Sequence, residues 1–487
     1  MRTPGRRILQ ACILLGLAAG LSTVPARAQA GNDSEVMAYF DKDHDGRLDA
    51  TELQAAYQAL RGQRSSGRRN QNWGVAGRGD RIEQEDVTIY PDTVPLYDPT
   101  ALRTIFIDFE DWEWEAKMEA FYRTDIEMPA TITIDGQVFH GAGVHFRGNS
   151  SYSSIPTGFK RSLQISLDYT DEDAEFLDHN KLRLLNANED PTFLRGILAL
   201  TVARDYYMAP QANLARVVIN GENWGLYMNV EHFNGDLTKP WYGKSDNDAR
   251  WKVPGSGRGM RGTLYYLGDN IVSYRQVYEI KSDDDPEQWQ ALIDLTRILA
   301  RTPPEELEAA LDGVLDVDGT LRFLAVDNLL VSNDGFWTKG ADYAIYRDGD
   351  GVFHLLQHDI NEFFLASSGR GGGSTSLSPL YSENDRSKAV AYYLLAVPEL
   401  KARYLDYVRE MSETWLTWDK LGPIVQQYVE LIRDDVYRDT KKLFYNEDFT
   451  VGVNDRNGFT DPISLRAFVE RRRAYLDGFF ERLDATP

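Results

Sequence analysis

The sequence predicts an α+β fold in two lobes, with a β-rich small lobe at about residues 100–235 and a helical large lobe at about residues 236–484. Before residue 235, apolar and polar side chains alternate between Asp-Gly and Asn-Gly pairs, which is typical of strands and hairpin turns. After residue 388, apolar residues instead recur with the spacing of amphipathic helices. With 487 residues and 42% hydrophobic content, the chain is long enough to bury a large core.

The N-terminus has the order of a secretory signal peptide. Three arginines precede an apolar run at residues 8–21, and the small residues ARAQA follow it. We therefore predict a signal peptide at residues 1–30 and export to the periplasm, the cell envelope or the medium. No later stretch is long and apolar enough for a membrane span, so the mature chain is expected to have no transmembrane segment.

The overall charge argues against a nucleic-acid partner. The formal net charge is -22 at pH 7, whereas binding to a phosphate backbone needs clustered lysine and arginine.

A calcium-binding motif, the EF-hand, follows the signal peptide within residues 31–62. The segment DKDHDGRLDATE alternates acidic residues, has Gly46 at the sharp turn and Leu48 as the apolar anchor, and ends on a glutamate. The predicted Ca²⁺ ligands are Asp41, Asp43, Asp45, Arg47 through its carbonyl, Asp49 and Glu52. Flanking segments have helical periodicity. EF-hands normally pair, so the partner of this single hand is another part of the chain, another molecule or nothing.

Residues 63–86 are predicted to form a flexible linker. The segment from residue 61 to residue 81 is rich in glycine, serine and arginine and has no apolar period.

The small lobe contains a candidate phosphate-binding loop. The segment RGNSSYSSIPTGFK is dense in small residues and lies between two predicted strands, and a lysine opens the second strand. Such a loop can place backbone amides and a cation against phosphate. A helix is expected next, with Asp190 as N-cap and Pro191 at its first position. Two further strands follow, and the order of these elements is that of the smaller lobe of a protein kinase.

The central stretch at residues 323–365 predicts a β-hairpin flanked by acids. Strands ADYAIYR and VFHLLQ enclose a DGDG turn, so their outer ends should lie side by side. Asp334, Asp342 and Asp359 would then converge at one rim of the sheet. Gathered carboxylates suit a hard cation that also binds phosphate oxygens. The alternative is that each aspartate only caps a turn.

From about residue 139 to residue 480 the chain resembles the CotH (spore-coat protein H) kinase family of atypical secreted kinases. The matching stretches are FRGNSS, FKRSLQISLD, LLNANEDPTFLR, VVINGENWGLYMNVEHF, YEIKSD, NDGFW, DYAIY, FHLLQHDINEFF and FVERRRAYL. The resemblance implies an atypical kinase-like fold over residues 87–487. It also implies ATP-dependent phosphoryl transfer to Ser or Thr hydroxyls of a protein substrate, with Mg²⁺ or Mn²⁺.

The resemblance also implies residue roles. Asp334 matches the catalytic aspartate that takes the proton of the acceptor hydroxyl, and Asp359 matches the aspartate that binds the metal, with Asp342 and Asn361 as further magnesium ligands. Lys160 is the preferred cation for the ATP phosphates, with Arg161 and Lys281 as alternatives. The candidate phosphate loop contributes Arg147, Asn149 and Ser150. Glu231 belongs either to the hinge region or to a structural ion pair.

Two positions depart from the family pattern. Many relatives have Asn in place of Asp342 and Asp in place of Asn361. The exchange keeps the total charge of the set, which is compatible with metal binding and also with a pseudokinase. Two functions therefore stay open: a secreted kinase with a calcium module, and a catalytically inactive calcium-binding envelope or surface protein.

Overall fold

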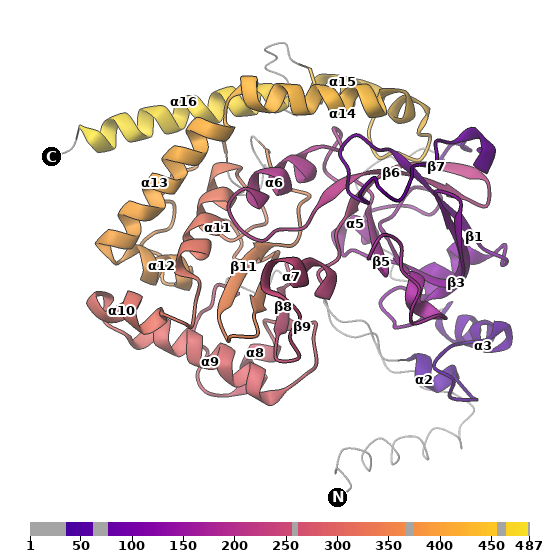
Figure 1. Cartoon of the computed structure of the whole chain (residues 1–487), viewed down its shortest axis with the longest axis horizontal. Coiled ribbons are helices and arrows are strands. Elements are labelled where there is room, and N and C mark those ends of the chain that lie inside the picture. Colours follow the sequence, from indigo (N-terminus) through magenta and orange to yellow (C-terminus); the bar gives the residue numbers. More distant parts are fainter. Residues whose placement is uncertain (1–35, 62–75, 256–261, 366–373, 455–463, 486–487) are drawn as a thin grey trace, which may run out of the picture.

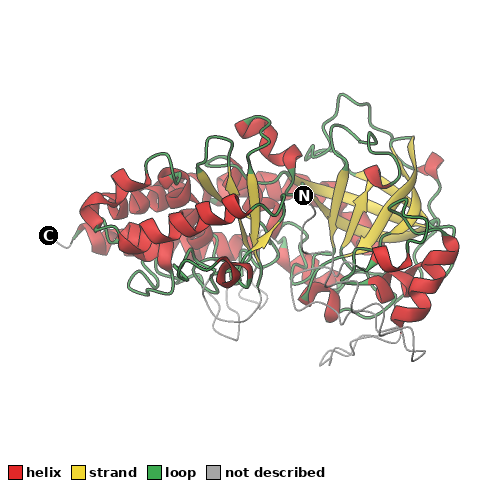
Figure 2. Ribbon diagram, turned by 90° about the horizontal axis from the view of Figure 1, so that it is seen from below, coloured by secondary structure: helices red, strands yellow, loops and turns green. Residues whose placement is uncertain are grey.

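The computed structural model describes residues 36–61, 76–255, 262–365, 374–454 and 464–485. It contains a closed barrel, a second sheet and a large group of helices, which confirms the mixed α and β composition (Figures 1 and 2). The predicted signal peptide lies outside the described residues.

The β-rich part forms a closed barrel with strand order β1-β2-β3-β4-β5-β7-β6. Its strands are β1 (Arg103–Asp108), β2 (Met128–Ile134), β3 (Gln137–Phe146), β4 (Leu163–Ser166), β5 (Lys181–Leu185), β6 (Ala212–Ile219) and β7 (Glu222–Val230). All neighbours are antiparallel except β1 and β6, which run parallel and close the barrel. The strands were predicted, but the closure was not, because it depends on pairing between segments about a hundred residues apart.

Two barrel hairpins follow the turn chemistry of the sequence. Asp135 and Gly136 join β2 to β3 with φ values of 49° and 81°, and Asn220 and Gly221 join β6 to β7 with φ values of 50° and 77°. Positive φ at both central residues is the geometry that matches the twist of a tight hairpin.

Helix α6 (Arg195–Arg204) begins later than predicted. The Asp190 carboxylate accepts hydrogen bonds from the backbone N–H groups of Thr192 and Arg195, at 2.9 Å each. These bonds form a turn rather than a helix cap. Phe193 has a φ of 61°, which is incompatible with a right-handed helix. Pro191 therefore lies before the helix, and not at its first position.

The central hairpin is confirmed. Strands β10 (Tyr343–Arg347) and β11 (Phe353–Gln357) pair antiparallel, with Ile345 opposite Leu355. They extend into a four-stranded sheet of order β11-β10-β8-β9 through β8 (Ala249–Val253) and β9 (Glu279–Ile280). This sheet lies between the barrel and the helices (Figure 2).

The described chain also contains a large set of helices. They are α4 (Trp114–Phe121), α5 (Ser150–Ser153), α7 (Gly235–Tyr242), α8 (Ile271–Arg275), α9 (Pro286–Arg301), α10 (Pro304–Leu311), α11 (Val317–Leu329), α12 (Ala389–Leu395), α13 (Pro398–Trp415), α14 (Trp418–Arg438), α15 (Asn446–Gly452) and α16 (Leu465–Asp484), with short 3₁₀ turns at Gln84–Asp86 and Leu167–Tyr169. Buried α11 packs against α13, α6 and β11, while α14 contacts β7 and so joins the helices to the barrel (Figure 1).

The N-terminal module, residues 36–61, packs on the barrel. It consists of α2 (Met37–Phe40), an acidic loop and α3 (Ala50–Leu60). Its apolar residues belong to the same buried cluster as the barrel interior and α4: Val36, Leu48, Leu53, Ala56 and Leu60. The apolar face of this helix–loop–helix therefore packs against another part of the same chain.

The predicted linker is docked where it is described. The Ile82 N–H donates to the Gly221 carbonyl at 3.1 Å, and the Asn223 N–H donates to the Asp80 carbonyl at 2.8 Å. Residues 76–86 thus differ from the prediction of a flexible tether, because their backbone groups bond to the β6–β7 hairpin. Residues 62–75 lie outside the described residues.

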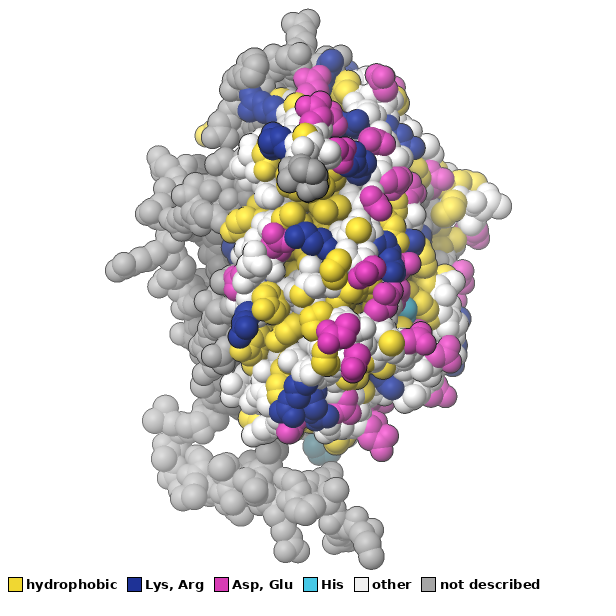
Figure 3. Space-filling model, turned by 90° about the vertical axis from the view of Figure 1, so that its left-hand side faces the viewer, with side chains coloured by type: hydrophobic (Ala, Val, Ile, Leu, Met, Phe, Trp, Pro, Cys, Tyr) yellow, Lys and Arg dark blue, Asp and Glu magenta, His cyan; other side chains and the backbone are white. Residues whose placement is uncertain are grey.

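The helical side of the molecule has a mixed surface. Figure 3 shows acidic and basic side chains interspersed with hydrophobic ones on this face. Among the described helices, none combines the length and the apolar composition that a membrane crossing requires.

Candidate functional site

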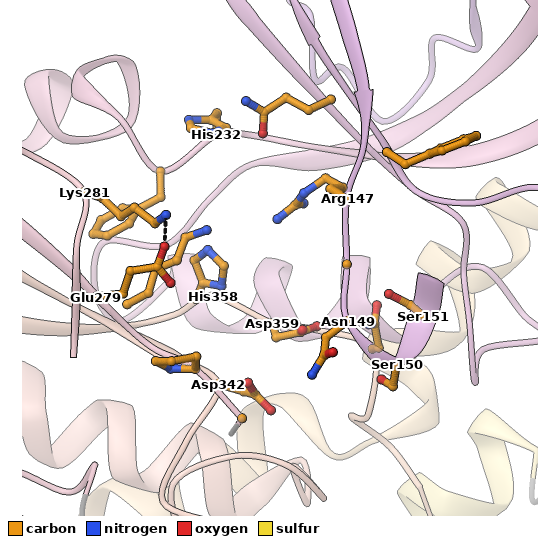
Figure 4. A pocket seen from close by; sticks show the side chains of 18 of the residues that line it. Arg147, Asn149, Ser150, Ser151, His232, Glu279, Lys281, Asp342, His358 and Asp359 are labelled. Atoms are coloured by element: carbon orange, nitrogen blue, oxygen red, sulfur yellow. Dashed lines mark hydrogen bonds and ion pairs between the residues drawn. The ribbon is translucent and has the colours of Figure 1, made fainter. Parts of the chain in front are cut away.

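A cavity of about 660 Å³ opens between the barrel and the central hairpin (Figure 4). Its walls come from the barrel strands, the loop after β3, the ends of β8 and β9, and the segments that flank the hairpin. In Figure 4, Arg147 and His232 lie on the barrel side, Asp342 lies on the hairpin side, and His358 lies between them. Segments far apart in the sequence therefore form a single polar site.

The hairpin places two carboxylates at the same end of its strands. The Asp359 N–H donates to the Asp342 carbonyl at 3.1 Å, which fixes the two backbones side by side. Burial and the neighbouring Asp359 carboxylate raise the pKa of Asp342 to about 8. Two carboxylates that repel each other in a cavity are suited to a divalent cation, which neutralises both.

Asp342 has a left-handed backbone, with a φ of 57°. Aspartate and asparagine adopt this conformation more readily than other non-glycine residues. The backbone thus accepts either the Asp of this chain or the Asn of the family pattern. Asn361 lines the same cavity. The exchange of Asp and Asn between positions 342 and 361 therefore leaves the total charge of this one site unchanged.

Asp334 also lines the cavity, where it forms an ion pair with Lys339. Glu362 is a further acid of this wall, and burial raises its pKa. The structure therefore brings together all the acids predicted to meet at the hairpin, namely Asp334, Asp342 and Asp359. None of them is walled off: the Asp334 side chain is 28% exposed and Asp359 is an exposed residue.

The loop after β3 lines the opposite wall with Arg147, Asn149 and Ser150, as predicted for the phosphate loop. It is held in place from α4. The Tyr122 hydroxyl donates to the Gly148 carbonyl at 2.6 Å, and Arg123 donates to Asn149 Oδ1 at 2.5 Å.

Lys160 does not belong to this site. Its side chain is fully buried, and its Nζ donates to Asp439 at 2.5 Å and to the Leu226 carbonyl at 2.6 Å. Burial lowers the pKa of Lys160, while the Asp439 carboxylate opposes that shift. The lysine joins the barrel to the end of α14, so its assignment to the ATP phosphates is wrong.

Of the two alternatives to Lys160, one has a structural role and the other lines the cavity. Arg161 is buried and donates to Glu119 at 2.6 Å, away from the cavity. Lys281 lines the cavity, where it forms an ion pair with Glu279. Glu231 accepts a hydrogen bond from the Gln211 N–H at 2.8 Å and lies 3.9 Å from Arg204. Among the two roles open to Glu231, these contacts are those of a structural ion pair.

Arg147 and Lys281 of the cationic wall were named from the sequence, but their neighbours Lys252 and Arg183 were not. Lys252 projects from β8 beside Lys281, and Arg147 and Arg183 lie close enough to affect it. Burial lowers the pKa of Lys252 well below its ordinary value, and the neighbouring Lys281 and Arg147 charges lower it further. The sequence does contain a signal for Lys252. It lies between the buried Trp251 and Val253 in one strand, and such alternation places the lysine on the opposite face of the strand.

Two histidines complete this wall. Burial lowers the pKa of His232 and of His358 well below the ordinary value, and the charge of Lys252 adds to both shifts. Both imidazoles are therefore neutral at neutral pH. A polyanion that entered the cavity would meet lysine and arginine on this side and the hairpin acids on the other.

In the N-terminal module, the acidic loop is wrapped on itself. Ligand atoms of Asp41, Asp43 and Asp45 all lie within 4.8 Å of one another. Asp41 accepts from the His44 and Gly46 N–H groups at 2.7 and 3.0 Å, and Gly46 has a φ of 85°. The Glu52 carboxylate is directed back to the loop, where it accepts from the Lys42 and Asp49 N–H groups.

Fold and cavity together define the class: an α+β protein with a mixed carboxylate and cation site between a closed barrel and an antiparallel hairpin. The chain belongs to the CotH kinase protein family, whose model matches residues 144–476, more than half of the chain. It is also similar to the inner spore coat protein H of Bacillus subtilis (strain 168). The two are 24% identical over 302 residues, which cover 60% of this chain and 76% of that protein.

Proposed function

We propose that this protein is an exported atypical protein kinase that transfers the γ-phosphoryl group of ATP to Ser or Thr hydroxyls of a protein substrate. The observation that carries the proposal is the cavity itself, where Asp342 and Asp359 face a wall of cations. Phosphoryl transfer needs little beyond alignment and charge neutralisation. A carboxylate pair for a metal ion and cations for the phosphates meet both needs.

Each residue of the cavity has a place in this proposal. Asp359, Asp342 and Asn361 supply the oxygen ligands that Mg²⁺ or Mn²⁺ prefers, and the ion neutralises phosphate charge. Lys252, Lys281 and Arg147 replace Lys160 as the cations for the phosphates, with Asn149 and Ser150 beside them. Asp334 is accessible from the cavity and accepts the proton of the attacking hydroxyl.

We also propose that the N-terminal module binds Ca²⁺. The ligands are those predicted from the sequence: Asp41, Asp43, Asp45, the Arg47 carbonyl, Asp49 and Glu52. Support comes from the wrapped loop and from the close approach of its first three carboxylates. A seven-oxygen set of this kind is typical of calcium rather than magnesium.

The expected site of action is outside the cytoplasm. The N-terminal sequence has the order of a signal peptide, and the relative in Bacillus subtilis is named as a spore coat protein. Both are consistent with a protein that works in the cell envelope or in an outer coat layer.

Incubation with γ-labelled ATP and either Mg²⁺ or Mn²⁺ tests the kinase proposal, with self-phosphorylation and transfer to Ser/Thr peptides as readouts. We expect transfer that EDTA abolishes. Asp359→Asn should lower the rate by about 100-fold or more and leave the unfolding midpoint nearly unchanged. The matched control is Asp312→Asn, since Asp312 is an exposed aspartate in the turn after α10. Equal transfer by wild type and Asp359→Asn contradicts the assignment.

A second candidate is a catalytically inactive calcium-binding protein of the envelope or surface. The exchange of Asp and Asn between positions 342 and 361 and the wrapped calcium loop favour it. In that case calcium binding persists while labelled phosphate is not transferred to any hydroxyl, including those of the protein itself.

A further inference from the structure

One short segment, Tyr122–Asp125, contacts both the N-terminal module and the phosphate loop. It follows α4 and leads into β2, and all four of its residues line the cavity. Arg123 has a φ of 63° within it. A non-glycine residue in this conformation persists only where its surroundings hold it, so the segment has a defined shape.

On one side, Asp125 holds the first helix of the module. Its Oδ1 accepts from the backbone N–H groups of Val36 and Met37, at 2.8 and 2.9 Å. Helix α2 runs directly into Asp41, the first residue of the calcium loop. The position of α2, and with it the angle between α2 and α3, is therefore tied to Asp125.

On the other side, the same segment holds the phosphate loop. The Tyr122 hydroxyl bonds to the Gly148 carbonyl, and its ring stacks on Tyr152 with centroids 3.5 Å apart. Arg123 binds the Asn149 side chain. The loop that lines the cavity is thus connected to the calcium loop through four consecutive residues.

A second contact joins the module to the barrel near the cavity. Arg47, whose carbonyl is a predicted calcium ligand, donates from its side chain to the Thr170 carbonyl at 2.6 Å. Burial raises the pKa of the adjacent Tyr169 to about 12, and the charges of Glu127 in the cavity wall and Asp45 in the calcium loop contribute to the increase.

We propose that calcium binding in the N-terminal module strengthens nucleotide binding in the cavity, through the Tyr122–Asp125 segment. This inference rests on the proposed function. Calcium fixes the conformation in which α2 meets Asp125, and that conformation also holds Gly148 and Asn149 against the cavity. A ligand that stabilises one site then lowers the cost of ordering the other, and the effect is reciprocal.

The test is the dissociation constant of the β,γ-imido analogue of ATP, measured by calorimetry at a fixed saturating Mg²⁺ concentration with either calcium or EGTA. For the full mature chain we expect binding about fivefold or more tighter in calcium, the lower end of typical coupling between sites. Equal constants in a protein that the same calorimeter shows to bind calcium overturn the inference alone, whereas absence of calcium binding overturns the calcium proposal as well. Absence of binding in both conditions overturns the proposed function and this inference with it.

Three variants separate the coupling from other causes. Glu52→Gln weakens calcium binding and should give the EGTA value in both conditions, which excludes calcium acting in the cavity. Asp125→Ala should make the two constants equal while calcium still binds to the module. Asp125→Asn keeps the Oδ1 acceptor for the Val36 and Met37 N–H groups, and should retain the difference. If Asp125→Ala retains it as well, the assigned route is wrong.

Hydrogen–deuterium exchange provides a readout without nucleotide. Calcium should slow exchange in the peptide that contains Gly148–Ser154 of the wild-type protein, and this slowing should be lost in Asp125→Ala. Exchange in this peptide that does not respond to calcium contradicts the proposal, whatever the nucleotide does.

Discussion

The proposed calcium loop and the cavity gather their carboxylates in opposite ways. All the proposed calcium ligands lie within twelve consecutive residues, from Asp41 to Glu52, and local hydrogen bonds wrap the loop. The cavity instead draws its residues from Tyr122 to Glu362, across the barrel, the second sheet and the hairpin. A local site can be recognised from one sequence motif, whereas a site assembled from distant segments depends on the whole fold.

The largest effects are expected for substitutions of two lysines, one in the cavity wall and one buried between the barrel and the end of α14. Lys252→Met removes an amine of the cavity wall whose charged form a bound phosphate would favour, and should weaken Mg²⁺–nucleotide binding by about 10–100-fold, the cost of a charged hydrogen bond. Lys160→Met removes the buried ammonium group that balances the charge of the fully buried Asp439, and should lower the free energy of unfolding by about 3–5 kcal/mol. Calorimetry and denaturant unfolding of both variants measure these effects. If Lys160→Met instead weakened nucleotide binding and Lys252→Met instead lowered the free energy of unfolding, Lys160 would belong to the site after all.

Calcium removal tests how closely the local module depends on the rest of the fold. Leu48, Leu53 and Leu60 share one buried cluster with the barrel interior, so calcium should stabilise the barrel and the module together. At a calcium concentration of about 1,000 times its Kd, the gain is about 4 kcal/mol. Thermal unfolding with calcium and with EGTA measures it, and Glu52→Gln should remove most of the difference. An early transition of the module, with an unchanged barrel transition, would show that the two are independent.

A smaller effect concerns the buried acid behind the hairpin. Asp327 accepts from the Trp337 N–H at 3.2 Å, and burial raises its pKa to about 7. The pKa of Asp327 is higher in the folded protein than in the unfolded chain. Between about pH 4 and 7, the carboxyl group is therefore protonated in the folded protein and ionised in the unfolded chain. Stability from this group is therefore complete below about pH 4 and is lost as the pH rises through 7.

Asp327→Asn should flatten that dependence. The wild-type free energy of unfolding should fall by about 1 kcal/mol per pH unit more than that of the variant over pH 5–7. Chemical denaturation at several pH values gives both curves. Parallel curves would show that Asp327 is already ionised in the folded protein.

The sequence predicted the parts of the site that local patterns encode. The Asp-Gly turn and alternating strands located the hairpin, and the hairpin alone places Asp342 beside Asp359. The strands of the barrel were also predictable from alternation. Their closure into a barrel was not, because the parallel pairing of β1 with β6 brings together residues that no local signal connects.

The cations were misassigned for the same reason. Lys160 follows a small-residue loop, as a phosphate-binding lysine would, yet its partner Asp439 lies 279 residues away in sequence. Only the fold shows that this partner buries the side chain. Lys252 carries no motif, and its place in the cavity follows from the pairing of β8 with β10.

The most direct test of the central claim is a calorimetric titration of ATP into the protein without residues 1–30, first with Mg²⁺ and then with EDTA. If Asp342 and Asp359 hold a metal ion opposite the cationic wall, one equivalent of ATP binds with Mg²⁺, and binding is weakened by about tenfold or more with EDTA and in Asp342→Ala. Binding that is equally tight with EDTA, or no binding with Mg²⁺, would contradict the account.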